Sequence, residues 1–203
     1  MTDPEQPTQR TNLRDRLRRE TRPAHDALDQ ALDLIDRPID LPGYTRLLAR
    51  FHGFHRAIEP ALAATLPAAL TEGRSKLSAL RHDLLTCGMR EHEIAALSAI
   101  AGLPALTGRP EAMGALYVVE GSTLGGRLIG RHMQRNPAIP ADACHYFNVY
   151  GEGTGERWRE ICDALERVSD PDTDDRAMGA ANAIFARLQD WLMPGTDGGR
   201  DRD

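Results

Sequence analysis

A histidine and an aspartate near the start of the chain have the spacing of a metal ligand and its supporting carboxylate. His25 falls on the apolar side of a helical pattern that includes Leu28 and Leu32, and Asp29 follows it by four residues. Residues four apart lie on one face of a helix, so the carboxylate can reach the imidazole. A carboxylate bonded to one ring nitrogen fixes the tautomer and makes the other nitrogen a better metal ligand. The same spacing also fits a core histidine beside a surface carboxylate, and both interpretations stay open.

A glycine-rich stretch inside a long helical pattern is the second informative feature. The sequence YVVEGSTLGGRLIG at 117–130 contains Gly121, Gly125, Gly126 and Gly130. Each glycine costs roughly 1 kcal/mol relative to alanine in a helix interior, which indicates that side chains have to be absent there. Tyr117, Gly121 and Gly125 are four residues apart and expose bare backbone on one face, where either a second helix or a flat ligand could approach. A phosphate-binding loop is a poorer match, because no strand precedes the glycines and no lysine follows them.

The other histidines are weaker candidates for metal ligands. His52 and His55 have a permissive i, i+3 spacing, but no Glu-x-x-His partner accompanies them, so we expect one core or interface residue and one exposed residue. The remaining four show no ligand spacing and are expected at the surface: His82, His92, His132 and His145. The segment GEGTG at 151–155 is interpreted as a flexible connection rather than a phosphate site.

Helices must position these residues. Alanine, leucine and arginine recur throughout the chain, and they lose little freedom in a helix, so we predict an all-α fold. Apolar spacing predicts about seven or eight helices in a single domain over residues 12–193, and Pro23 predicts a kink or a break in the first of them. The predicted segments are 12–34, 41–62, 75–85, 91–100, 110–135, 157–168 and 173–192.

Charge and cysteine content narrow the class of protein. The chain of 203 residues has a formal net charge of −5, which argues against general nucleic-acid binding. Three cysteines without C-x-x-C spacing predict neither a disulfide set nor a zinc site, and they fit a reducing cytoplasm. No segment resembles a signal peptide or a membrane span, so we expect a cytoplasmic protein that binds no membrane.

The two ends of the chain differ in composition from the predicted domain. Residues 1–11 are polar with two prolines, and residues 194–203 are rich in glycine and aspartate, so both are expected to be disordered. Basic residues gather near the N-terminus, where a solvated helix face is the default interpretation. They are Arg10, Arg14, Arg16, Arg18, Arg19 and Arg22.

Taken together, these motifs resemble the haem oxygenase family, particularly the bacterial branch that supplies biliverdin to bacteriophytochromes. The resemblance rests on Thr21-x-x-x-His25 and on YVVEGSTLGG at 117–126. Weaker support comes from F-x-x-Y-G at 147–151 followed by Trp158, and from A-x-x-x-F at 181–185 with Trp191. It implies a bundle in which haem lies between a proximal and a distal helix.

The resemblance also implies an activity and roles for individual residues. The chain would open haem to biliverdin with release of CO and iron, using O2 and an external electron donor. His25 would be the proximal ligand of the haem iron, with Asp29 hydrogen-bonded to it. Gly121, Gly125 and Gly126 would form the bare backbone of the distal helix, which would steer oxygen toward a meso carbon of the ring. No strong acid would stand above the iron, and protons would arrive through ordered water.

Haem propionates need cationic partners. The resemblance gives Arg18 the best claim, seven residues before His25, with Tyr117 and Arg159 as further candidates. Ser122 stands where mammalian-type members carry the carboxylate that organises the water, which leaves the proton-delivery group open. A basic rim formed by the other N-terminal arginines would suit an acidic electron donor such as a ferredoxin, a flavodoxin or a reductase.

Two other functions stay open at this point. A carrier or sensor on the same fold would bind haem without degrading it. A helical interaction protein would use its glycines for packing and would bind no haem.

Overall fold

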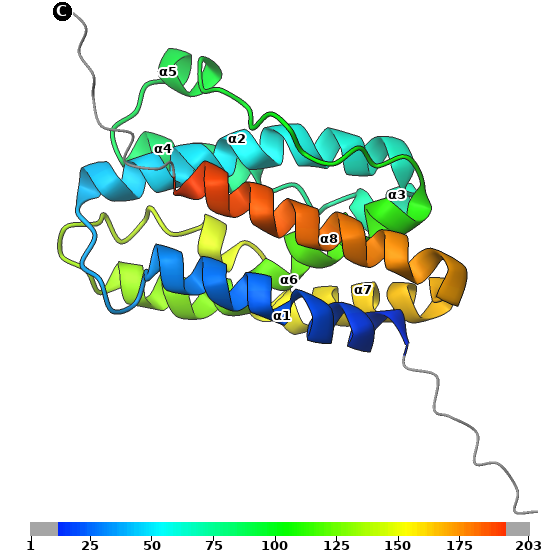
Figure 1. Cartoon of the computed structure of the whole chain (residues 1–203). Coiled ribbons are helices and arrows are strands. Elements are labelled where there is room, and N and C mark those ends of the chain that lie inside the picture. Colours follow the sequence, from blue (N-terminus) through cyan, green and yellow to red (C-terminus); the bar gives the residue numbers. More distant parts are fainter. Residues whose placement is uncertain (1–11, 194–203) are drawn as a thin grey trace, which may run out of the picture.

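The computed structural model describes residues 12–193, which form eight α-helices and two short 3-10 helices (Figure 1). In chain order they are α1 (Leu13–Leu32), α2 (Leu41–Thr65), α3 (Ala68–Thr71), α4 (Leu77–Thr86), α5 (Glu91–Ala95), α6 (Arg109–Gln134), η1 (Tyr146–Asn148), η2 (Gly151–Gly153), α7 (Thr154–Val168) and α8 (Pro171–Leu192). The predicted all-α class is confirmed over this range. The arm at 1–11, with Arg10, and the tail at 194–203 lie outside the described residues.

Helix α8 lies at the centre of the bundle. It packs against α6 and α1 and also contacts α2, while α7 covers α6 and α1, and α4 packs on α2. Figure 1 shows α8, in orange and red, running between α1 below it and α2 above it. None of the helices within 12–193 is long and apolar enough to cross a membrane.

Side-chain caps and prolines fix where the long helices begin. Asn12 accepts a hydrogen bond from the Asp15 amide at 2.9 Å, and Asp40 accepts one from the Gly43 amide at 2.8 Å. Such caps satisfy amides that have no partner within the helix. Pro110 lies in the first turn of α6, where its missing N–H costs nothing. These signals are visible in the sequence, and the starts that it predicts for the helices beginning at 12, 41 and 110 agree with the structure.

Three local expectations are wrong. Of the two alternatives predicted at Pro23, the break is absent, because α1 continues through it while burying Leu17, Thr21 and Leu28 on one face. The helix expected over 91–100 ends at Ala95, where the Arg56 guanidinium donates to the carbonyls of Ala95 and Leu97 and holds a non-helical path. The connection expected over 151–155 instead forms η2 and the first turn of α7.

The two histidines of α2 are both buried, which corrects the expectation that one of them is exposed. His52 is 8% and His55 is 1% exposed. The physical reason is that α2 is covered by α4, α6 and α8. Burial lowers the pKa of both imidazoles, although a hydrogen bond to Glu59 works in the opposite direction at His55.

Candidate functional site

A cavity of about 580 Å³ lies between α1 and the glycine-rich part of α6. This volume is within the range of about 300–1,000 Å³ typical of small-molecule sites. Its apolar walls come from several elements, and they include Leu28, Leu32, Phe51, Phe54, Phe147, Trp158, Phe185 and Leu188. The cavity therefore suits a large ligand with an apolar body.

His25 lines this cavity from α1, and two carboxylates lie beside one of its ring nitrogens. Its Nδ1 lies 3.3 Å from Asp29 Oδ2 and 3.6 Å from Asp26 Oδ1, and its ring meets the Phe185 ring edge-on at 5.9 Å between centroids. Burial raises the pKa of the Asp29 carboxyl, and the neighbouring His25 opposes that rise. Because Nδ1 faces the carboxylates, Nε2 is the nitrogen left for a metal ion. The structure thus brings the predicted pair together and adds Asp26, which the sequence analysis had not singled out.

The glycines of α6 divide into two groups with different neighbours. A Cβ atom at Gly126 would lie 2.8 Å from the Phe147 carbonyl oxygen, and one at Gly130 would lie 3.2 Å from Phe147 Cβ. A Cβ at Gly121 would be in ordinary contact with the Trp158 ring at 3.6 Å, and one at Gly125 would meet nothing within 4 Å. Helix packing therefore explains Gly126 and Gly130, whereas no protein neighbour within 4 Å accounts for the missing side chain at Gly125.

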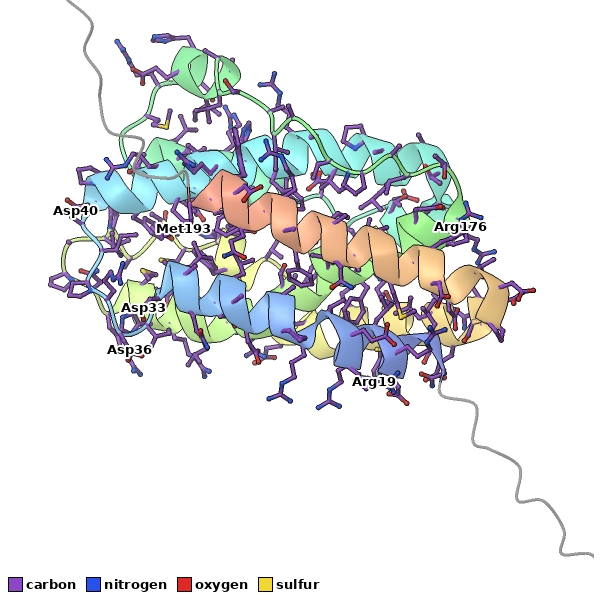
Figure 2. The ribbon with its side chains drawn as sticks, viewed as in Figure 1. Arg19, Asp33, Asp36, Asp40, Arg176 and Met193 are labelled. Atoms are coloured by element: carbon purple, nitrogen blue, oxygen red, sulfur yellow. The ribbon has the colours of Figure 1, made fainter. Side chains whose placement is uncertain are left out.

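The N-terminal arginines also divide, by the face of α1 on which they lie. Arg14, Arg18 and Arg22 are four residues apart and all line the cavity. Arg16 and Arg19 are not among the residues that line it, and Figure 2 shows Arg19 on the outer side of α1. Arg18 and Arg22 are exposed, so the expectation of a solvated face is confirmed for them, and they also bring guanidinium groups to the cavity.

Three further site residues predicted from the sequence differ in whether they line the cavity. Tyr117 lines the cavity beside the Trp158 ring, 5.5 Å away between centroids, and burial raises the pKa of its hydroxyl. Ser122 also lines the cavity, and its hydroxyl donates to the Val119 carbonyl at 2.8 Å. Arg159 is exposed on α7 and is not among the residues that line the cavity, so the structure does not bring it to the site.

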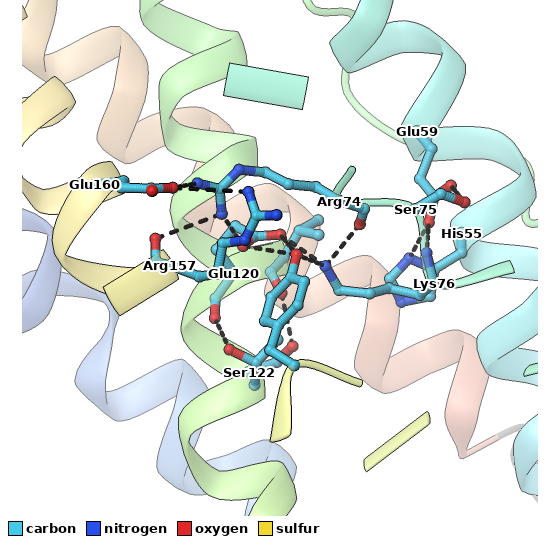
Figure 3. A network of polar contacts seen from close by, with 12 residues as sticks. His55, Glu59, Arg74, Ser75, Lys76, Glu120, Ser122, Arg157 and Glu160 are labelled. Carbon is cyan, nitrogen blue, oxygen red and sulfur yellow. Dashed lines mark hydrogen bonds and ion pairs between the residues drawn. The ribbon is translucent and has the colours of Figure 1, made fainter. Parts of the chain in front are cut away.

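A buried ionic cluster supports α6 immediately before Gly121 (Figure 3). Glu120, 1% exposed, accepts hydrogen bonds from Arg74 at 2.6 Å and from Lys76 at 2.7 Å. Burial lowers the pKa of Lys76, although Glu120 favours its charged form. Lys76 also lines the cavity, a role that the sequence does not predict, because Lys76 stands at the start of the predicted segment 75–85 and its partner Glu120 is 44 residues away.

A hydrogen-bonded chain leads away from another part of the cavity wall. Tyr146 lines the cavity, and its hydroxyl lies 3.3 Å from His55 Nε2. On the other side of the ring, His55 Nδ1 lies 3.0 Å from Glu59 Oε1. Glu59 Oε2 in turn accepts a hydrogen bond from the hydroxyl of the exposed Ser75 at 2.6 Å. These groups connect the cavity to the surface of the protein.

Comparison with known proteins identifies the family to which this arrangement belongs. The family model described as "Heme oxygenase" matches residues 11–193. The chain belongs to the haem oxygenase family. A haem oxygenase of Xanthomonas campestris pv. campestris (strain 8004) is 32% identical over 158 residues, which are 76% of this chain and 91% of that protein. The predicted family, fold class and enzyme class are therefore confirmed, and the enzyme class is that of an oxidoreductase.

Solved structures of bacterial haem oxygenases share the fold. Haem oxygenase-1 of Synechocystis sp. PCC6803, in complex with haem, superposes with a TM-score of 0.72 at 15% identity and covers 91% of this chain and 92% of that one. The NO- and CO-bound enzyme of Neisseria meningitidis gives 0.72 at 20% identity, covering 94% and 95%. The enzyme of Leptospira interrogans gives 0.72 at 17% identity, covering 91% and 100%. At these identities the likeness concerns the fold alone.

Proposed function

We propose that this haem oxygenase binds haem in the cavity between α1 and α6, with His25 as the proximal ligand of the iron. One observation carries the proposal. The imidazole of His25 and the bare backbone at Gly125 line the same cavity, one from each helix. The bound haem supplies both the iron that activates O2 and the ring that is opened to biliverdin, CO and iron.

The lining of the cavity fits the two chemical parts of haem. The aromatic and aliphatic walls suit the porphyrin, because the apolar surface of the ring is removed from water when it lies against them. The propionates require cations, and Arg18 would bind them with Arg14 and Arg22 beside it on α1. Arg18 makes no ion pair within residues 12–193, so binding a propionate would break none there.

The residues on the two sides of the ring would have different tasks. Asp29, together with Asp26, would hold Nδ1 of His25 and so orient Nε2 toward the iron. On the other side, Gly121 and Gly125 would leave room for oxygen to reach a meso carbon, and neither carries an acidic side chain. Gly126 would keep this part of α6 in place through its contact with the backbone of Phe147.

Protons would reach the cavity along the chain from Ser75 through Glu59 and His55 to Tyr146. Hydrogen bonds to His55 and neighbouring groups keep the pKa of Glu59 below its usual value, against the effect of burial. Glu59 is therefore ionised near neutral pH and can accept a proton at the surface end. Ordered water in the cavity would complete the transfer.

Electrons would come from an acidic donor of the ferredoxin, flavodoxin or reductase class in the cytoplasm. The cavity-lining arginines of α1 would attract such a donor to the haem edge. Electrostatic attraction of this kind raises association rates and weakens with salt.

Titration of the purified protein with hemin tests the proposed ligand. The wild type should give the absorption spectrum of a histidine-ligated haem. His25→Ala should lose that spectrum, and His92→Ala, which alters an exposed histidine on α5, should keep it. An unchanged spectrum in His25→Ala would remove the proximal ligand from the proposal.

Turnover distinguishes the enzyme from a carrier or sensor. With reducing equivalents and air, the haem band of the wild type should disappear while the broad red absorption of biliverdin grows. A haem band that persists with a competent donor would contradict the proposed reaction.

A further inference from the structure

Three side chains with metal-ligating atoms meet on the surface of the protein, and none of them lines the cavity. His82 lies on α4, and Asp142 and His145 lie in the segment that leads into η1. His82 Nε2 is 3.2 Å from Asp142 Oδ2, and His145 Nε2 is 3.7 Å from Asp142 Oδ1. One ligand atom from each residue lies within 4.8 Å of the other two. This cluster could not be predicted from the spacing of residues in the sequence, because His82 is 60 residues before Asp142.

The donor set and its dimensions suit a divalent transition-metal ion. Zinc binds imidazole nitrogen and carboxylate oxygen at about 2.0–2.2 Å, so tetrahedral ligand atoms lie about 3.4 Å apart. Each oxygen of the Asp142 carboxylate has one imidazole nitrogen near this separation, His82 Nε2 at 3.2 Å from Oδ2 and His145 Nε2 at 3.7 Å from Oδ1. Two imidazoles and one carboxylate leave further coordination positions open to water, as in catalytic zinc sites and in ferrous sites with two histidines and a carboxylate. All three side chains are exposed, so an ion can reach them.

A buried carboxylate stands behind one of the imidazoles. Asp83 is fully buried, and its Oδ1 lies 3.2 Å from His145 Nδ1 while also accepting the His145 amide at 3.0 Å. Its other oxygen accepts the Tyr146 amide at 2.8 Å. Histidine ligands of metals usually have their second nitrogen held by a carboxylate or carbonyl, which orients the ring. Asp83 and the Asp142 carbonyl oxygen, 3.0 Å away, both lie at Nδ1 of His145 in this way, and Nε2 is left 3.7 Å from the Asp142 carboxylate.

We propose that His82, Asp142 and His145 bind one divalent transition-metal ion at the surface, with Asp83 orienting His145. This site is separate from the cavity that contains His25, since neither His82, Asp142 nor His145 lines that cavity. Metal binding therefore requires no haem, and it can be measured whether or not the chain degrades haem.

Calorimetric titration of the haem-free, full-length protein with Zn²⁺, after removal of metals with a chelator, tests the site. The wild type should bind one equivalent. Loss of an outer partner of a metal ligand costs roughly 10- to 100-fold in affinity, so loss of a ligand in His82→Ala or His145→Ala should cost more than about 100-fold. Asp142→Asn should weaken binding while preserving the shape of the side chain.

Two control variants separate this site from the other histidines. His92→Ala removes an exposed imidazole on α5, and His25→Ala removes the proposed haem ligand; both should bind Zn²⁺ like the wild type. Circular dichroism of each variant verifies the fold, which these exposed substitutions should preserve.

The visible absorption of bound Co²⁺ is an independent test of how the proposed site coordinates a metal ion. Co²⁺ added to the wild type should produce the visible absorption bands of a four- or five-coordinate ion, and His145→Ala should lack them. Absence of saturable Zn²⁺ binding to the wild type would overturn the proposal and leave three surface side chains in ordinary ionic contact. Undiminished binding in His82→Ala and His145→Ala, or its loss in His25→Ala, would overturn it equally.

Discussion

Gly125→Ala is expected to make the protein more stable and, at the same time, a poorer binder of haem. Glycine inside a helix is less stable than alanine by about 0.5–1 kcal/mol. A Cβ atom at Gly125 meets nothing within 4 Å, so no clash offsets this gain. For a domain of this size the gain corresponds to a rise in Tm of about 1–4 °C. The new methyl group would occupy space on the cavity side of α6, and Gly125→Leu would occupy more of it.

Two other glycines of α6 serve as controls with the opposite expected sign. A Cβ at Gly126 would lie 2.8 Å from the Phe147 carbonyl oxygen, and a Cβ at Gly114 would lie 2.0 Å from the Ala177 carbonyl oxygen of α8. Overpacking of this kind typically costs about 1–3 kcal/mol. After the helix-propensity gain is subtracted, Gly126→Ala should lose up to about 2 kcal/mol, and Gly114→Ala should lose more, since its overlap is with the backbone of α8.

Thermal unfolding of the haem-free variants and hemin titration of the same samples provide the two readouts. The expected order of Tm is Gly125→Ala above the wild type, then Gly126→Ala, then Gly114→Ala. Hemin affinity should fall from the wild type to Gly125→Ala and further to Gly125→Leu. A lower Tm for Gly125→Ala would refute the assignment of open space at this position. Unchanged hemin affinity and turnover in a folded Gly125→Leu would refute the proposal that haem lies against this face of α6.

Other expectations follow from the charged groups. Arg18→Gln should weaken hemin binding about two- to fivefold, the size of an exposed ion pair, with a smaller effect at high salt; Arg19→Gln, on the outer side of α1, should change nothing in the same titration. Glu120→Gln should lower the free energy of unfolding by about 3–5 kcal/mol in urea titrations, because it leaves the buried Lys76 without a carboxylate and Arg74 with Glu160 alone; a loss below about 1 kcal/mol would contradict this account of the cluster. Burial lowers the pKa of His55 below the ordinary value of about 6.5, so between the two values the unfolded chain binds a proton that the folded chain does not. The stability that neutral His55 contributes is thus fully present above about pH 6.5. It decreases as the pH falls from there toward the lower pKa of the folded state. The difference in unfolding free energy between about pH 7.5 and 5.5 should be smaller in His55→Gln than in the wild type, and equal differences would contradict the assignment.

The sequence predicts the helices better than it predicts the cavity, for a physical reason. Caps, prolines and apolar periodicity are local, so the long α6 can be predicted to within one residue at each end. The neighbours of each glycine depend on which segment packs there, and only the structure separates Gly125 from Gly126. Lys76 reaches the cavity from the start of the predicted segment 75–85, and no local pattern shows that its side chain lines the cavity.

The arginines of α1 form an intermediate case. Positions 14, 18, 22 and 25 share one helical face, and that spacing is visible in the sequence. A basic run is nevertheless a solvated surface in most proteins. Only the position of α1 beside the cavity shows that this largely exposed face also lines a candidate site.

The two supports of α6 have a consequence for motion. The Glu120 cluster fixes the helix on one side of the bare turn, and the Phe147 backbone fixes it on the other side, at Gly126 and Gly130. The turn from 121 to 125 is therefore a short span between two fixed ends, with a glycine, the residue that restrains the backbone least, at each end of it. Local opening of the helix should be most frequent in this span. Hydrogen exchange of its amides should therefore be faster than in the flanking turns. Such a span could adjust to a flat substrate and to its bent, opened product without moving the rest of the bundle.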